Sequence, residues 1–216
     1  MEAPVSPGDQ AMKIACLGWG SLVWHPGNLP LSCKWKKDGP ALPIEFARES
    51  SRSRITLIIS DVPDTVVSLW ALMSVDTLDA AKFALAKRED VPDEYIQYSI
   101  GWWRKLDGAS HGRGADVIAK WAPAYDLDAV VWTNLKPGFK KGAKTVPPYA
   151  DVLKYFQGLI ERGEHAPAEE YVRKAPEQVM TPYRRSLQKD LGWTPIRPSR
   201  FACLTRFWRR RAASPA

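Results

Sequence analysis

Two short segments carry residue types that could act together on a small substrate. The first is GWGSL at residues 18–22, a glycine-flanked turn that directly follows the apolar run at residues 13–17. Glycine tolerates positive φ angles, and successive backbone N–H groups aimed into one concavity bind a carboxylate or an oxyanion. We therefore expect an anionic group of a ligand to lie at Gly20, Ser21 and Leu22.

The second segment is a helix expected over residues 76–89. At roughly 100° per residue, one narrow face of this helix holds Leu78, Ala81, Leu85 and Glu89. A carboxylate on an apolar stripe near a helix C-terminus is disfavoured in its charged form by burial and by the helix dipole, so its pKa should rise. Glu89 is therefore a candidate general base. The alternative is that Arg88 simply pairs with Glu89 at the helix end.

Two arginines follow the turn on neighbouring predicted strands. Arg48 or Arg54 could bind a ligand carboxylate through a bidentate guanidinium fork. Surface pairing with Glu45 or Glu49 is the commoner role for such arginines, and the pattern leaves both interpretations open.

The elements that must position these groups follow from periodicity. Apolar, β-branched runs at residues 43–49, 54–60 and 65–74 predict consecutive antiparallel strands, because their connections are too short for crossovers. The helix that begins at Asp76, with that residue as its N-cap, comes next. A further buried strand is expected at residues 129–134.

The C-terminal part of the chain is predicted to be helical. One amphipathic helix begins at Pro148 and ends near Gly163, and another begins at Thr181 and ends at Gly192. Strands followed by helices indicate an α+β fold, with a strongly bent sheet or a small, mostly antiparallel β-barrel flanked by helices.

Length and composition are typical of one globular domain. The chain has 216 residues, of which 45% are hydrophobic and 25% charged, enough for a core without metal or disulfide support. We expect a single domain over residues 12–208, a disordered leader at residues 1–11 and a basic flexible tail at residues 209–216.

Several classes of partner are not expected. Three widely spaced cysteines, Cys16, Cys33 and Cys203, predict reduced thiols and a cytoplasmic protein. No signal peptide or membrane segment is recognised.

The net charge of +7 is concentrated in the tail. A terminal run of basic residues is more often a solvated surface than a nucleic-acid contact. The three histidines lack metal-ligand spacing, so neither a metal nor another cofactor is expected. Oligomeric state is not readable from the pattern.

Taken together, several motifs resemble the γ-glutamylcyclotransferase superfamily. The similarity covers roughly residues 13–90 and rests on GWGSL after the first strand, FARES at residues 46–50, the strand sequences RITLIIS and TVVSLWALM, and LDAAKFALAKRE on the helix. Its most specific part is the pairing of the glycine turn with the Arg88–Glu89 dipeptide at a helix end. Residues 130–134 and 148–149 match only in type and order.

The resemblance implies a fold, a reaction and site residues. The fold would be a small β-barrel flanked by helices, and the reaction would convert a small γ-glutamyl amide or peptide to 5-oxoproline with release of an amine or amino acid. The turn residues Trp19, Gly20, Ser21 and Leu22 would bind the substrate, and Glu89 would be the acid/base. Trp19 stands where the family has tyrosine, so a non-catalytic binding module for a small carboxylated metabolite is the alternative.

Overall fold

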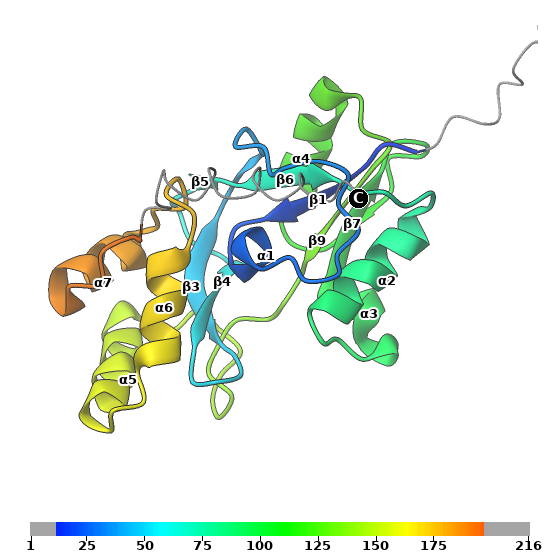
Figure 1. Cartoon of the computed structure of the whole chain (residues 1–216). Coiled ribbons are helices and arrows are strands. Elements are labelled where there is room, and N and C mark those ends of the chain that lie inside the picture. The colour runs from blue at the N-terminus through cyan, green and yellow to red at the C-terminus, as the bar shows by residue number, and fades with distance from the viewer. Residues whose placement is uncertain (1–11, 197–216) are drawn as a thin grey trace, which may run out of the picture.

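A computed structural model describes residues 12–196 of the chain as a mixed α+β structure (Figure 1). The predicted leader at residues 1–11, the tail at residues 209–216 and the last part of the predicted domain, residues 197–208, lie outside the described residues. Cys16 and Cys33 are free thiols, and Cys203 also lies outside this range. Within the described part, no helix is both long and apolar enough to cross a bilayer.

A five-stranded sheet forms the centre of the molecule, with the strand order β6-β1-β9-β7-β8. Strands β1 and β9 run parallel, whereas every other neighbouring pair in this sheet is antiparallel. The strand bounds are β1 Ile14–Gly18, β6 Leu69–Leu72, β7 Ile100–Arg104, β8 Ser110–His111 and β9 Ala129–Thr133. Because β1 and β9 are parallel, their carboxyl ends meet at the same edge of the sheet.

The remaining strands form two short ribbons, so residues 12–196 confirm the α+β class and the mostly antiparallel sheet but contain no closed barrel. The ribbons pair β2 (Ala41–Leu42) with β5 (Val66–Val67), and β3 (Ile44–Glu49) with β4 (Ile55–Ile59). Pro43 separates β2 from β3, and proline cannot donate to a ladder. Ser68 separates β5 from β6, because its hydroxyl and its N–H both donate to the Pro40 carbonyl. The predicted strand at residues 65–74 is therefore split.

The central sheet is covered on both faces. One set of β1 and β9 side chains packs against α2 (Leu78–Arg88), which carries the predicted apolar stripe of Leu78, Ala81 and Leu85. The other set belongs to a core cluster shared with the β3–β4 ribbon, and the C-terminal helices lie on the far side of that ribbon (Figure 1). This double burial explains why β1 is buried at every position and reads as a continuous apolar run.

Helix α2 begins one residue later than predicted. Thr77, rather than Asp76, is the N-cap, because its side-chain oxygen accepts a hydrogen bond from the Ala80 N–H at 3.2 Å. Glu89 is the C-cap residue at the other end of the helix.

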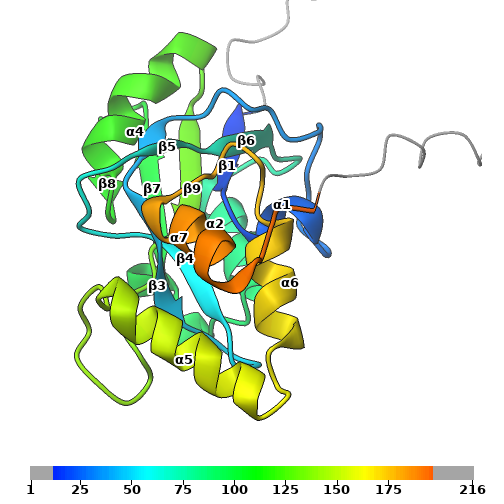
Figure 2. The same ribbon diagram turned by 90° about the vertical axis from the view of Figure 1, so that its left-hand side faces the viewer.

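The C-terminal helices pack beside the β3–β4 ribbon (Figure 2). Helices α5 (Tyr149–Glu161) and α7 (Pro182–Leu191) confirm the two predicted helices, and Thr181 caps α7 by accepting from the Arg184 N–H. Helix α6 (Ala166–Lys174) lies between them in the chain and was not predicted. The other helical segments are α1 Ser21–Trp24, η1 Asp93–Tyr95, α3 Ile96–Ser99, α4 Ala115–Trp121 and η2 Ala122–Tyr125.

A buried arginine fixes the segment between α6 and α7. The Arg184 side chain is fully buried, and its guanidinium donates to the carbonyls of Ala175 at 2.6 Å, Pro176 at 2.7 Å and Val179 at 2.9 Å. Burial lowers the pKa of Arg184 to about 10, so the group stays charged at neutral pH. These contacts hold the end of α6, the helix that carries Tyr171.

Replacing Arg184 with leucine should strongly destabilise the fold. The substitution removes all three guanidinium hydrogen bonds, and only the Pro176 carbonyl keeps another donor, the Val179 N–H. The free energy of unfolding should therefore fall by about 3 kcal/mol or more in a denaturant titration. Arg185→Leu is the matched control, because exposed Arg185 donates to one carbonyl, that of Met180. Equal stability of the two variants would contradict the role given to Arg184.

Candidate functional site

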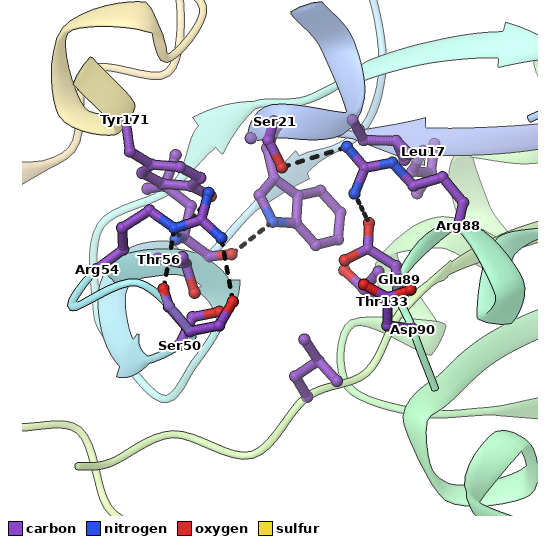
Figure 3. Close-up of a pocket in the computed structure, with 17 residues that line it drawn as sticks. Leu17, Ser21, Ser50, Arg54, Thr56, Arg88, Glu89, Asp90, Thr133 and Tyr171 are labelled. Atoms are coloured by element: carbon purple, nitrogen blue, oxygen red, sulfur yellow. Dashed lines mark hydrogen bonds and ion pairs between the residues drawn. The ribbon is translucent and has the colours of Figure 1, made fainter. Parts of the chain in front are cut away.

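A cavity of about 140 Å³ lies where the carboxyl ends of β1 and β9 meet the end of α2 (Figure 3). It is lined by the turn after β1, by the first residue after α2, by part of the β3–β4 ribbon and by one residue of α6. Five of the six predicted site residues line this cavity, namely Trp19, Gly20, Ser21, Leu22 and Glu89.

The glycines of the turn are required by close packing rather than by positive φ angles. Neither Gly18 nor Gly20 has a positive φ, so the sequence-based reason for them is wrong. A Cβ on Gly18 would lie 2.8 Å from the Trp35 ring, and a Cβ on Gly20 would lie 2.4 Å from the Tyr171 hydroxyl oxygen. The turn therefore has glycine where a bulky aromatic side chain touches the backbone.

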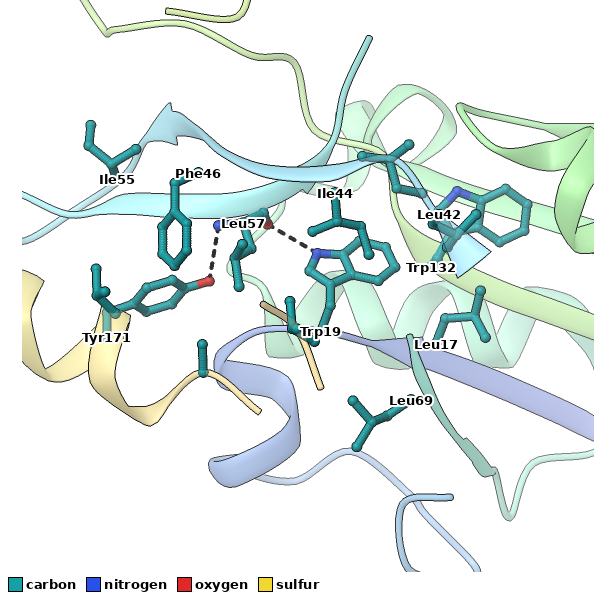
Figure 4. Packing of buried hydrophobic residues seen from close by; sticks show 14 of the residues in the cluster. Leu17, Trp19, Leu42, Ile44, Phe46, Ile55, Leu57, Leu69, Trp132 and Tyr171 are labelled. Atoms are coloured by element: carbon teal, nitrogen blue, oxygen red, sulfur yellow. Dashed lines mark hydrogen bonds between the residues drawn. The ribbon is translucent and has the colours of Figure 1, made fainter. Parts of the chain in front are cut away.

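Trp19 points from the turn into the protein core (Figure 4). Its side chain is 3% exposed, and its indole N–H donates to the Leu57 carbonyl of β4 at 3.1 Å. The residue thus anchors the turn to the neighbouring ribbon and presents an apolar ring, with no hydroxyl, to the cavity.

Glu89 lies at the end of α2, across the cavity from Arg54 and Tyr171 (Figure 3). Its side chain is 19% exposed, and one carboxylate oxygen lies 2.8 Å from the Arg88 guanidinium. Burial raises the pKa of Glu89 above its ordinary value, Arg88 opposes this shift, and the Asp90 carboxylate adds to it. The predicted ion pair and the predicted upward pKa shift are therefore both present.

Arg88 connects the two halves of the site. Its Nη1 donates to Glu89, while its Nη2 donates to the Ser21 hydroxyl at 3.4 Å and to the His25 carbonyl at 2.6 Å. One guanidinium thus fixes the carboxylate relative to the turn. The side chain is 12% exposed, so solvent screens these charges only in part.

Tyr171 of α6 closes the site from the C-terminal half of the chain. Its hydroxyl accepts a hydrogen bond from the Leu57 N–H at 3.3 Å and lies against the backbone amide of Ser21. Its ring packs edge-on against Trp24 and Phe46. Burial raises the pKa of Tyr171 to about 12, so the hydroxyl stays protonated at neutral pH. Sequence reasoning missed this residue, although the spacing of Ala168, Tyr171 and Val172 marks a helix face.

Arg48 lies outside the cavity. Its guanidinium donates to the Lys136 carbonyl at 2.9 Å and lines a neighbouring hollow, together with Lys140 and Lys144, that reaches Glu89 from the other side. A shift in the β3–β4 register between Phe46 and Arg48 changes the direction of the side chain, which a pattern of alternation does not reveal.

Arg54 lines the cavity in place of Arg48. Its Nε and Nη2 donate to the carbonyl and hydroxyl oxygens of Ser51, at 3.2 and 3.4 Å. The expected pairing with Glu45 or Glu49 is wrong, since neither glutamate forms an ion pair with an arginine within the described range. Buried Glu45 instead accepts from the start of α7.

The arrangement suits proton transfer beside a bound polar ligand. A partly buried carboxylate with a raised pKa is a candidate general base, and the turn, Ser21 and two arginines offer donors to an anionic group. Between residues 12 and 196, no three metal-ligating side chains lie together.

No family model matches the chain, and neither a curated protein nor a solved structure matches it.

Proposed function

We propose that this chain is a cyclotransferase that converts a small γ-glutamyl amide or peptide to 5-oxoproline and releases an amine or amino acid. The observation that carries the proposal is the convergence of Glu89 and the GWGSL turn on one cavity, with Arg88 hydrogen-bonded to both. The same convergence supports membership of the γ-glutamylcyclotransferase superfamily, although the open sheet departs from the barrel which the resemblance implies.

The reaction needs little beyond a folded substrate and a proton carrier. The α-nitrogen of the γ-glutamyl group attacks its own γ-carbonyl carbon, a five-membered ring forms, and the bond to the leaving nitrogen breaks. The attacking ammonium loses two protons and the leaving nitrogen gains two, so no co-reactant is consumed. Holding the chain in the ring-closing conformation is worth roughly 7–11 kcal/mol of the barrier.

Glu89 carries the protons in this proposal. Its carboxylate takes a proton from the α-ammonium and returns it to the departing nitrogen, and the burial that raises the pKa of Glu89 makes it a better base for the first transfer. The backbone of the turn and Ser21 bind the polar end of the substrate. Arg88 is a positioning residue, because it holds the carboxylate against the turn.

The size of the cavity supports a small substrate group. Its volume of about 140 Å³ is well below the ~300–1,000 Å³ of pockets that take drug-sized ligands, so it suits a glutamyl group and excludes a larger acyl group.

Incubation with γ-glutamyl dipeptides, glutathione and γ-glutamylamines should yield 5-oxoproline, measured by chromatography and mass spectrometry, from at least one of them. Thermal stabilisation by these compounds without product would instead support the binding-module alternative. Neither product nor stabilisation with any compound would contradict both functions.

A further inference from the structure

A second, larger hollow adjoins the 140 Å³ cavity. Its volume is about 730 Å³, and it shares six lining residues with the smaller cavity, namely Ser21, Ser51, Arg54, Arg88, Asp90 and Tyr171. The shared residues form a common wall, so a ligand seated in the small cavity can extend into the large one. The glutamyl group needs only the smaller of the two. The larger hollow is therefore available to whatever is attached to that group.

Positive charge predominates around the larger hollow. Four cationic side chains line it, against two carboxylates, and the four are Arg52, Arg54, Lys87 and Arg88. Lys87 pairs with Asp93 and Arg88 pairs with Glu89. Of the two carboxylates, Glu170 is paired with Lys174, whereas Asp90 forms no ion pair within the described residues. Two unpaired cations, Arg52 and Arg54, therefore stand against one unpaired carboxylate. The excess of positive charge lining the hollow disfavours a cationic ligand group there and favours an anionic one.

Arg54 is the cation best placed to bind that anion. Its guanidinium lies 5.6 Å from the Tyr171 ring centre, and its two bonds to Ser51 use two of its five N–H donors. Within the described residues it forms no ion pair, in contrast to Lys87 and Arg88. The ring and Ser51 therefore hold the guanidinium in a fixed orientation where it lines both cavities, and Figure 3 shows it beside Tyr171.

We infer that the larger hollow binds the leaving group of the substrate and that Arg54 is the specificity-determining residue that binds a carboxylate on it. The preferred substrates are then γ-glutamyl amino acids or peptides, whose leaving amine bears a carboxylate, rather than γ-glutamylamines, whose leaving amine bears none. Trp24 and Phe83 line the same hollow and give an apolar side chain of the leaving group a surface to contact. This inference rests on the proposed function.

A matched pair of compounds tests the inference by binding alone. γ-Glutamyl-leucine and γ-glutamyl-isoamylamine differ only by the carboxylate of the leaving group. Their dissociation constants are measured by titration calorimetry in the Glu89→Gln background, so that neither compound is consumed. We expect γ-glutamyl-leucine to bind at least about tenfold more tightly, because a charge-assisted bidentate contact is lost in the other compound. Arg54→Gln should bring the two constants together, whereas Arg162→Gln, at an exposed ion pair on α5, should preserve the ratio.

Three results of the binding experiment would overturn the inference. Equal affinity of the two compounds with Arg54 present excludes a carboxylate site in the hollow. Equal weakening of both compounds by Arg54→Gln assigns Arg54 to the glutamyl α-carboxylate, which they share. Binding of neither compound removes the leaving-group site altogether. By contrast, equal rates of 5-oxoproline formation from both compounds by the protein with Glu89 would leave the proposed function intact and defeat only the inference.

Discussion

Replacing Glu89 with glutamine should lower kcat for 5-oxoproline formation by at least about 100-fold, because general acid–base catalysis contributes roughly 10²- to 10⁴-fold and glutamine cannot carry the proton. The substitution keeps the size of the side chain and an oxygen that accepts from Arg88. Stopped reactions with the best γ-glutamyl substrate measure the effect. Glu161→Gln is the control, because Glu161 is an exposed glutamate at the last position of α5. Activity of Glu89→Gln close to that of the unmodified protein would remove the proposed acid/base.

The raised pKa of Glu89 should affect how both activity and stability depend on pH. Because burial raises the pKa of Glu89 above its ordinary 4.5, kcat/KM should rise with pH through that higher value as the carboxylate forms. In the unfolded chain this group ionises at its lower, ordinary pKa. The folded protein therefore loses stability as pH rises from the unfolded to the folded pKa, and the cost persists above it. Glu89→Gln removes that cost, so its Tm should match or exceed that of the unmodified protein at neutral pH and lose this advantage in acid.

Replacing Gly20 with alanine should reduce both stability and activity. The new Cβ would lie 2.4 Å from the Tyr171 hydroxyl, and Tyr171 cannot move freely because it is 6% exposed and packed on Phe46 and Trp24. Overpacking of this kind costs about 1–3 kcal/mol, and the displaced turn no longer faces Glu89 correctly. Denaturant titration and the 5-oxoproline assay measure the two effects.

Two further variants test the cause of the Gly20→Ala effect. Combining it with Tyr171→Phe removes the clashing oxygen, so the double variant should lose less stability than the sum of the two single variants. Gly158→Ala is the control, because Gly158 lies inside α5 with only the flexible end of Arg162 near its Cβ position, and it should be neutral or slightly stabilising. Additive costs for Gly20→Ala and Tyr171→Phe would show that the two groups do not compete for space.

Local signals predicted the parts of the site that lie within one element. Strand β1, the turn after it and the apolar face of α2 follow from periodicity, and Glu89 follows from that face. Their meeting depends on the packing of α2 against β1 and β9, which periodicity alone does not specify. The convergence of the turn and Glu89 was therefore inferred from the resemblance to a family rather than from the pattern.

Features set by contacts between distant segments were missed. Tyr171 contacts the turn from α6, and the sequence of residues 18–22 does not predict a contact with an aromatic residue of that helix. The barrel failed as a prediction because Pro43 and Ser68 interrupt ladders that apolar patterning treats as continuous. Arg48 was predicted as a substrate-binding residue, with Arg54 as the other candidate, but the cavity is lined by Arg54, and the register shift in β3 falls next to Arg48.

The cavity is completed only after Tyr171 of α6 has been synthesised, because this residue forms one of its walls. Turn and carboxylate both belong to the first 90 residues, whereas the aromatic wall that touches the turn emerges from the ribosome some 80 residues later. A nascent or truncated chain that ends before residue 166 would expose the turn and both arginines to water. The cavity would then be completed last, after the segment anchored by Arg184 has docked.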